Sequence, residues 1–317
     1  MPAPDPTQRA APLAAIVGPT GVGKSDLAMA LAGRLPVEIV VADSRQVYRG
    51  MDIGTAKPSS ADRSAVPHHL LDLAQPGERF TVADWVQRAR VLLPEIRGRG
   101  RLPLIVAGTG LYLRALVDGY DFGGRPDSGA VRESLRADLR ASGLHELAAR
   151  LVARDPGGAS RMDLRNPRRV LRALELTELA GEPIRPGQQP YPGPLAMVGV
   201  MRPRDALTAR IAARTERMFA MGLVEEVASL RDGGLDLRTA PLGSHGYREA
   251  ARLLAGEWDR ATAVAATVRR TRQYAKRQMT WFRAERRIVW IDAGSLEADE
   301  PAIVDRAVEL IRRLLDA

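Results

Sequence analysis

Residues 13–25 read LAAIVGPTGVGKS, an apolar run followed by a glycine-rich turn that ends in Lys24 and Ser25. The turn fits the phosphate-loop pattern G-x-x-x-x-G-K-[ST], placed after a strand and before a helix as that pattern requires. Glycines let backbone N–H groups surround a phosphate, and the following helix adds its positive dipole end. Lys24 supplies a compact charge, and the Ser25 hydroxyl can hold Mg²⁺. We predict a di- or triphosphate site formed by Gly18, Pro19, Thr20, Gly21, Val22, Gly23, Lys24 and Ser25, with Ser25 as metal ligand.

Further short apolar runs alternate with helical patterns along the chain. Apolar runs that end in turn-forming or acidic residues are typical of buried parallel strands. Their alternation with helices favours an open α/β sheet with helices on both faces, of the P-loop NTPase-like kind. We predict strands at 13–18, 37–43, 102–107, 196–201 and 288–292, and helices at 24–35, 82–97, 206–230, 247–254, 260–282 and 302–315.

The stretch 121–194 breaks this alternation. It shows only helical periodicity and lies between a Gly-Gly-Arg-Pro turn at 123–126 and a proline-rich segment at 182–194. We predict a helical insertion at 121–194 within a catalytic core formed by 13–120 and 195–317. Residues 1–12 contain four prolines and no apolar segment. They are expected to form a disordered leader and not a signal peptide.

The composition narrows the possible classes of protein. The chain has 317 residues, a net charge of +9 and no cysteine. Disulfides, thiolate metal sites and cysteine nucleophiles are therefore excluded, which fits a cytoplasmic protein. No apolar run approaches the ~20 residues that cross a bilayer, so we expect no membrane partner. No long apolar helix stripe is visible, so a monomer is the default expectation.

Most of the positive charge lies in one segment. Between Arg269 and Arg287 there are eight basic residues and one acid, Glu285, interleaved with Tyr274, Trp281 and Phe282. Such a helix suits a polyanion, because Arg and Lys can contact phosphates while aromatic faces stack on bases. A solvated basic helix face is the alternative.

Asp43 stands at the end of the second predicted strand. An acid there, at the carboxyl end of a strand in an open sheet, lies where such folds bind ligands. A cap for the turn at 44–46 is the alternative. The strand at 102–107 is instead followed by Gly108, Thr109 and Gly110. It therefore lacks the second acid that an NTPase or kinase usually uses to organise Mg²⁺.

Six motifs occur in the order seen in tRNA dimethylallyltransferases, and the chain resembles that family from about residue 13 to 293. They are the phosphate loop, DSRQVYRGMDIGTAKP at 43–58, HHLLD at 68–72, GTGLY at 108–112, NPRR at 166–169 and KRQMTW at 276–281. The resemblance implies transfer of a dimethylallyl group from dimethylallyl diphosphate to N6 of adenosine-37, beside the tRNA anticodon, with Mg²⁺ as cofactor. A prenyl diphosphate in the loop would explain the missing second acid.

The resemblance also implies three catalytic residues. Asp43 would be the general base, because the adenine amine must lose a proton as it attacks. Arg214 would stabilise the departing diphosphate together with Lys24. Arg217 is its rival, and a solvated helix face is the alternative. Thr109 would lie near the attacking amine, unless it is a simple turn residue.

The remaining motifs would hold the anticodon stem-loop, whose target base must leave its stack at a cost of about a few kcal/mol. One set would read the target and its neighbours, a second would hold the stem from the insertion, and a third would hold it from the core. The expected tRNA contacts are Asp43, Ser44, Arg45, Gln46 and Thr109; Arg132, Arg168, Arg169 and Arg172; and Gly243, His245, Arg248, Lys276, Arg277, Gln278, Trp281 and Arg283.

Two other functions stay open on sequence alone. An adenylate prenyltransferase would use free nucleotide, although a mononucleotide does not need so much positive surface. A P-loop kinase or RNA-binding NTPase would release or transfer phosphate from ATP. Lys57 receives no firm role. His68 and His69 lack a nearby third metal ligand, so we expect them to pack the loop before Asp72.

Overall fold

The computed structural model describes residues 11–120, 129–180, 189–237, 239 and 241–316. The chain divides into two compact units, one formed by Met1–Gly119 with Pro190–Ala317 and the other by Tyr120–Gln189. Residues 1–10 of the expected leader lie outside the described part, as do the turn at 123–126 and most of the proline-rich segment at 182–194.

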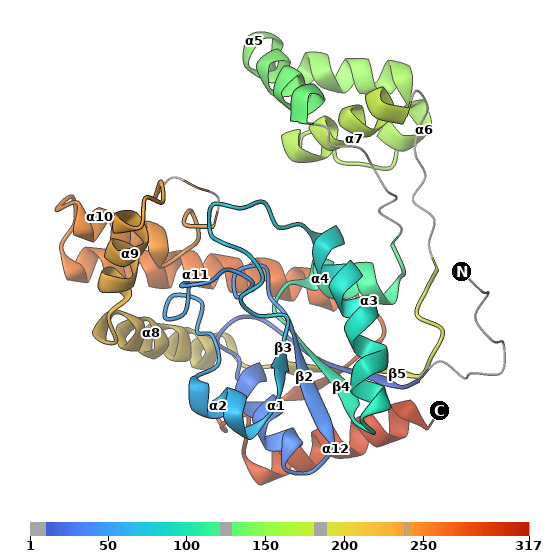
Figure 1. Cartoon of the computed structure of the whole chain (residues 1–317), viewed down its shortest axis with the longest axis vertical. Helices are drawn as coiled ribbons and strands as arrows, with labels where there is room; N and C mark the ends of the chain where they lie inside the picture. The colour runs from blue at the N-terminus through green and yellow to red at the C-terminus, as the bar shows by residue number, and fades with distance from the viewer. Residues whose placement is uncertain (1–10, 121–128, 181–188, 238, 240, 317) are drawn as a thin grey trace. The chain divides into compact units, whose positions relative to one another are not determined.

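A six-stranded parallel sheet forms the centre of the larger unit, with the strand order β3-β2-β4-β1-β5-β6 (Figure 1). This confirms the predicted open α/β fold. The two-residue strand β3 was not predicted, because it is too short to show a pattern. The strands are β1 Leu13–Val17, β2 Val37–Ala42, β3 His68–His69, β4 Leu102–Ala107, β5 Leu195–Met201 and β6 Ile288–Asp292.

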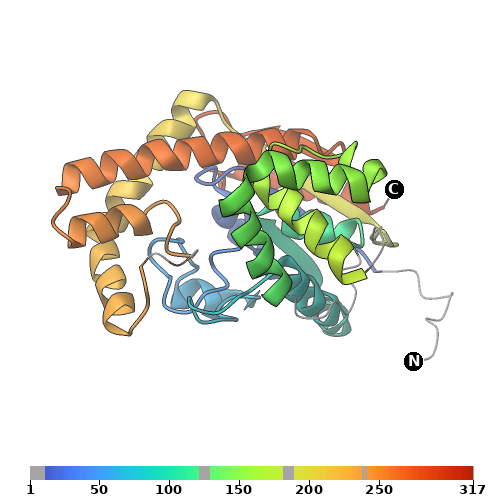
Figure 2. The ribbon, with the colours of Figure 1, turned by 90° about the horizontal axis from the view of Figure 1, so that it is seen from above.

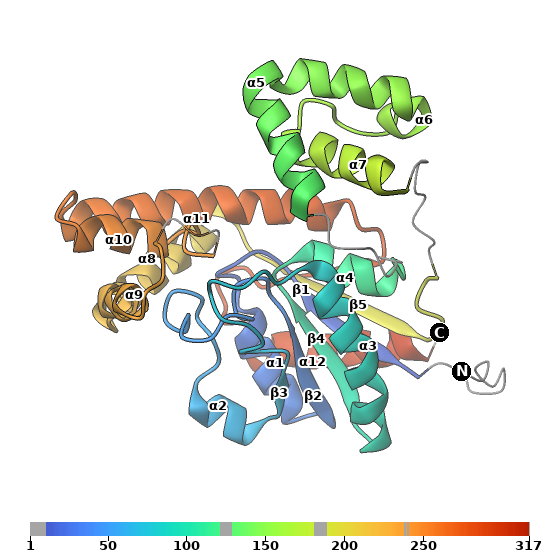
Figure 3. The same ribbon diagram turned by 45° about the horizontal axis from the view of Figure 1, so that its top comes forward.

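Helices cover both faces of this sheet (Figure 3). On one face, α1 (Lys24–Ala32) and α12 (Pro301–Leu315) pack over alternate strand residues and form the main apolar core. On the other face, α3 (Val82–Gly98) and α4 (Gly110–Val117) pack against β4. The short helix α2 (Ser60–Ala65) and α4 were not predicted, since both follow segments that resemble turns.

A second layer of helices completes the larger unit: α8 (Arg204–Ala220), α9 (Leu223–Asp232), α10 (Tyr247–Leu254) and α11 (Arg260–Arg283). The prediction of one helix at 206–230 is wrong. Gly222 adopts φ +100, a left-handed conformation that ends α8 and starts α9 in a new direction. The long helix α11, the long orange helix in Figure 2, packs against α8 and α10 and also contacts α4.

The smaller unit contains α5 (Gly129–Arg154), α6 (Pro156–Ala159) and α7 (Pro167–Ala180). Gly143 interrupts α5 with φ +77, so that segment is two consecutive helices. They pack around a small apolar core that includes Leu135, Leu147, Leu151, Val170 and Leu174. Across the described residues of both units, no helix is long and apolar enough to span a bilayer.

Candidate active site

The segments predicted to bind phosphate and to carry the catalytic residues each follow the carboxyl end of one of three neighbouring strands. The phosphate loop follows β1, Asp43 follows β2, and Thr109 lies just after β4. Strand β4 lies between the other two, and its last residue, Ala107, pairs with the ends of both. Because the carboxyl ends of parallel strands meet at one edge of a sheet, segments far apart in sequence come together here.

The backbone of the phosphate loop is held in place by surrounding cations. Three of its carbonyl oxygens accept hydrogen bonds from side chains: Pro19 from Lys24 at 2.9 Å, Gly21 from Arg210 at 3.2 Å and Val22 from Arg202 at 2.9 Å. Gly21 and Gly23 adopt φ +81 and +104, conformations that L side chains rarely reach. The loop is therefore fixed by its neighbours as well as by its glycines.

Two half-buried basic side chains, Lys24 and Arg214, lie beside this loop. Burial lowers the pKa of Lys24 to about 8, with the negative Asp43 acting in the opposite direction and Arg214 adding to the decrease. Arg214 reaches the loop from α8, where its Nη1 donates to Thr20 Oγ1 at 3.3 Å, and burial lowers its pKa. Arg217, its rival from the sequence, is exposed. The geometry therefore favours Arg214 as the arginine that meets an anion in the loop.

A cleft of about 990 Å³ opens next to the loop. Its walls are the start of α1, the segment 52–63 and the inner side of α8, so Lys24, Ser25 and Arg214 all face it. Ser25 is exposed at the first turn of α1, where a hydroxyl can reach a cation bound to phosphate oxygens. Among the described residues, no group of three or more His, Asp or Glu could hold a metal. The donor set fits Mg²⁺ held mainly by a diphosphate.

Asp43 both caps a turn and faces the centre of the site. Its Oδ1 accepts the backbone N–H of Arg45 at 2.8 Å and that of Gln46 at 3.4 Å, which is the capping role considered for it. Its Oδ2 lies against Gly108, where an added Cβ would approach it to 3.1 Å. Thr109 Oγ1 accepts the backbone N–H of Ser44 at 3.0 Å. These contacts fix the carboxylate at the meeting point of two turns.

Helix α11 contributes two side chains to the interior of the site. Gln278 is 7% exposed, and its amide bonds both the phosphate loop and the carbonyl of Gly108. The ring of Trp281 packs on Gly110, where a Cβ would come within 2.2 Å of it. Gly110 is therefore required by the close approach of the Trp281 ring, and a Cβ at Gly108 would crowd Asp43 Oδ2. Gln278 is buried and Trp281 is half-buried.

Aromatic and basic side chains border the site near Asp43. The ring of Tyr274 lies 4.8 Å from that of His245 and 5.7 Å from the Arg277 guanidinium. Burial, and next the charge of Asp43, raise the pKa of Tyr274 to about 12. Burial, and next the charge of Arg214, lower the pKa of His245 to about 4. His245 is therefore a neutral, half-buried imidazole near physiological pH.

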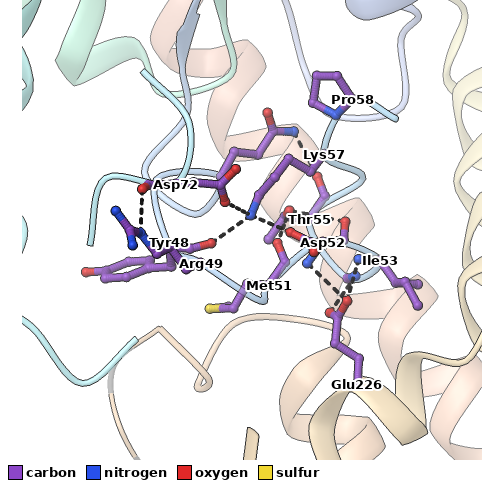
Figure 4. Close-up of polar contacts among 12 residues, drawn as sticks. Tyr48, Arg49, Met51, Asp52, Ile53, Thr55, Lys57, Pro58, Asp72 and Glu226 are labelled. Atoms are coloured by element: carbon purple, nitrogen blue, oxygen red, sulfur yellow. Dashed lines mark hydrogen bonds and ion pairs between the residues drawn. The ribbon is translucent and has the colours of Figure 1, made fainter. Parts of the chain in front are cut away.

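Lys57, which received no role from the sequence, joins the loop at 48–58 to the rest of the core (Figure 4). Its side chain is only 1% exposed. Its Nζ donates to the carbonyl of Tyr48 at 2.7 Å and pairs with Asp52 at 2.5 Å and Asp72 at 2.6 Å. Glu226 of α9 accepts the backbone N–H groups of residues 52, 53 and 54 at 3.0, 2.7 and 3.3 Å. Both contacts fix one wall of the cleft.

The other residues of the larger unit that the sequence singles out lie on its surface or within loops. Gln46 donates from its amide to the carbonyls of Thr55 and Ala56 at 3.0 and 3.1 Å. His69 bonds Glu38 at 2.7 Å, and the Arg99 hydrogen bond in particular lowers the pKa of Glu38 to about 2. The exposed predicted residues are Gly243, Arg248, Lys276, Arg277 and Arg283.

The predicted contacts in the smaller unit differ in exposure. Arg132 is half-buried and paired with the buried Glu175, which also pairs with Arg172 at 2.9 Å. Arg168 and Arg169 are exposed in the first turn of α7, where the side chain of Asn166 accepts their backbone N–H groups at 3.1 and 3.4 Å. Both side chains are therefore open to solvent at the start of this helix.

Comparison with known proteins decides the family. The model of the IPP transferase family matches residues 46–285, and a model described as Isopentenyl transferase matches residues 11–72. The chain belongs to the IPP transferase family. The resemblance predicted from the six motifs is thereby confirmed, and the chain is an enzyme of the transferase class.

Relatives in this family match the chain over almost its whole length. A tRNA dimethylallyltransferase of Nocardioides sp. is 45% identical over 314 residues, which covers 98% of this chain and 99% of the relative. One of Thermobifida fusca is 43% identical and covers 94% and 93%. The crystal structure of the full-length tRNA isopentenylpyrophosphate transferase of Bacillus halodurans matches with a TM-score of 0.69 and 38% identity, covering 96% of this chain and 98% of that one. These family members thus share both sequence and fold with the chain.

Proposed function

We propose that this member of the family transfers the dimethylallyl group of dimethylallyl diphosphate to N6 of adenosine-37 of tRNA. The observation that carries this proposal is the position of Asp43 and Thr109 beside a cation-rich phosphate loop, at the ends of three neighbouring strands. A carboxylate and an anion site so arranged suit a reaction in which one group loses a proton while another leaves as diphosphate. The relatives from Nocardioides sp. and Thermobifida fusca are named tRNA dimethylallyltransferase, which supports tRNA as the acceptor and dimethylallyl as the group transferred.

The leaving-group side of the reaction would take place in the phosphate loop. As the N6 lone pair forms a bond to C1 of the prenyl group, the C1–O bond breaks and its electron pair leaves with the diphosphate. Lys24, Arg214 and the N–H groups of the loop would stabilise the charge that develops there. Lys24 donates to the Pro19 carbonyl and Arg214 to the Thr20 hydroxyl, two neighbouring residues of the loop.

On the acceptor side, Asp43 would take the proton that N6 loses. Its Oδ1 is occupied by two backbone N–H groups, whereas Oδ2 faces Gly108 next to Thr109. The Thr109 hydroxyl, which accepts the backbone N–H of Ser44, would meet the amine or its neighbouring ring nitrogen. A fixed base near the reacting atoms contributes about 10²–10⁴-fold in rate.

Magnesium is part of the proposal because of the diphosphate. Ser25 is the protein residue that would hold it, from the first turn of α1 at the rim of the cleft. A bound Mg²⁺ would neutralise charge on the diphosphate oxygens. Few protein ligands are required, since Mg²⁺ usually keeps waters and substrate phosphates around it.

The basic surfaces are proposed to bind the anticodon stem-loop. In the core, the exposed face of α11 carries Lys276, Arg277 and Arg283. In the insertion, Arg168 and Arg169 are exposed at the start of α7. We propose that unit as the tRNA-contacting insertion, that the protein acts as a monomer, and that the reaction takes place in the cytoplasm.

One assay separates this function from its alternatives. Purified protein with Mg²⁺ and dimethylallyl diphosphate is offered unmodified tRNA with adenosine at position 37, free AMP, or ATP in place of the prenyl donor. We expect prenylated tRNA and released diphosphate in equal amounts. Prenylation of AMP without tRNA would support the adenylate prenyltransferase, and ATP turnover without prenyl transfer would support the kinase or NTPase.

A further inference from the structure

The amide of Gln278 connects the two loops that carry opposite sides of the reaction. Its Oε1 accepts the backbone N–H of Thr20 in the phosphate loop at 2.9 Å. Its Nε2 donates to the carbonyl oxygen of Gly108 at 2.7 Å. Thr20 and Gln278 are 258 positions apart in sequence, so this contact is a long-range connection through the centre of the site.

The partners determine which way the amide points and which side chains could replace it. One end meets an N–H, which needs an acceptor, and the other meets a carbonyl, which needs a donor. A carboxylate supplies only acceptors, and a methionine supplies neither. Gln278 is also buried, and its side chain hydrogen-bonds that of its half-buried neighbour Tyr274.

From Gly108 the connection continues to the proposed base. Gly108 precedes Thr109, whose hydroxyl oxygen accepts the N–H of Ser44, and a Cβ added at Gly108 would lie 3.1 Å from Asp43 Oδ2. The backbone N–H of Thr109 in turn donates to the carbonyl of Ala42 at 3.0 Å, one residue before Asp43. A displacement of Gly108 would therefore be transmitted to the carboxylate through two short contacts.

We propose that Gln278 is a positioning residue that sets the separation between the phosphate loop and the turn at 108–110, and so aligns the leaving group with the general base. This rests on the proposed function. Because the N–H of Thr20 is bonded to Gln278 in this arrangement, the N–H groups that would meet the diphosphate come from the loop after Thr20. Misplacement of reacting groups by about 1 Å can cost about 10²-fold in rate.

The test compares Gln278→Met and Gln278→Glu with Gln273→Met and the wild-type chain. Gln273 is exposed on the same helix and serves as the matched control. For Gln278→Met we expect kcat to fall about 10–100-fold, while KM for dimethylallyl diphosphate and Kd for tRNA change by less than about 3-fold. For Gln273→Met we expect all three to stay at their wild-type values.

Gln278→Glu adds a readout that a purely structural role would not change. A protonated glutamic acid can donate its O–H to the Gly108 carbonyl, whereas the ionised form cannot, and burial favours the neutral form. The activity of this variant relative to wild type should therefore rise as the pH is lowered. The same variant tests the proposal if Gln278→Met fails to fold.

The outcomes distinguish the inference from the function on which it rests. If the wild-type chain prenylates tRNA and Gln278→Met has the same kcat, the positioning role alone is overturned. If the wild-type chain prenylates tRNA and Gln278→Met keeps its kcat but binds tRNA more weakly, Gln278 is a tRNA contact instead of a positioning residue. A wild-type chain that prenylates no tRNA would overturn the proposed function, and with it this inference.

Discussion

Thr109 Oγ1 accepts the backbone N–H of Ser44 at 3.0 Å, so the turn after β4 holds the turn after β2. The carboxylate of Asp43, next to Ser44, is held on two further sides. Its Oδ1 accepts the N–H of Arg45, and its Oδ2 lies beside Gly108. A base held in this way needs little rearrangement before it accepts a proton. A substitution of Asp43 that keeps the hydrogen bonds of the turn can therefore test its role as a base.

Asp43→Asn should lower kcat by about 10²–10⁴-fold while tRNA affinity stays within about 3-fold, because Asn keeps the Oδ1 acceptor for Arg45 but removes the base. Single-turnover prenylation and tRNA binding are the two measurements. Asp84→Asn, in the capping box of α3, is the control for general effects of removing a carboxylate. A parallel loss of tRNA affinity would show that Asp43 is structural.

The affinity for a prenyl diphosphate should fall as pH rises through about 8. Burial lowers the pKa of Lys24 to about 8, so the free enzyme loses this charge above that pH. A polyanion binds the protonated form better, and the affinity should decline by up to about tenfold per pH unit. Titration with a thio analogue of dimethylallyl diphosphate measures this decline above pH 7, where the terminal phosphate is largely ionised. Lys24→Met should bind weakly at every pH, and a similar decline in that variant would assign the titration to another group.

Lys57→Met should lower the free energy of unfolding by about 2–3 kcal/mol, because it removes the buried donor to the Tyr48 carbonyl and leaves Asp72 with Arg63 alone. Urea unfolding followed by circular dichroism measures the change. Lys276→Met removes an exposed lysine and should stay within about 0.5 kcal/mol of wild type. Equal effects of the two substitutions would contradict a structural role for Lys57.

Replacing both Arg277 and Arg283 by Ala should reduce the slope of log affinity for tRNA against log salt by about one to two units, since each arginine that contacts phosphate releases about one counterion. The matched control replaces Arg312 and Arg313, exposed on α12, and removes the same charge from another surface. An unchanged slope in the first variant would exclude these arginines from the tRNA surface.

The sheet could be predicted because its strands are local apolar runs ended by turn residues. The phosphate loop is equally local, and its pattern carries its own strand and helix. The break at Gly222 could not be seen, since the helical periodicity continues across 206–230 and only the left-handed backbone of one glycine interrupts it. Strand β3 consists of His68 and His69 alone, and its pairing with β2 depends on tertiary contact.

The candidate site could be predicted where its residues belong to a contiguous sequence motif. It could not be predicted where its arrangement depends on tertiary contacts between residues far apart in sequence. Asp43, Thr109 and Arg214 follow from the family resemblance. The arrangement of Gln278 between Thr20 and Gly108 does not, because nothing in the local sequence indicates that an amide on a basic helix turns inward. Lys57 is similar, since its two carboxylate partners become neighbours only when the loop closes.

The hydrogen bonds from Arg202 and Arg210 to the carbonyls of the phosphate loop have a thermodynamic consequence. A flexible loop would lose about 1–2 kcal/mol of conformational entropy for each residue that becomes ordered around an anion. A loop already constrained by guanidinium groups has lost most of that freedom during folding. More of its electrostatic attraction is then retained as binding free energy, and the unfavourable entropy falls on the stability of the fold instead.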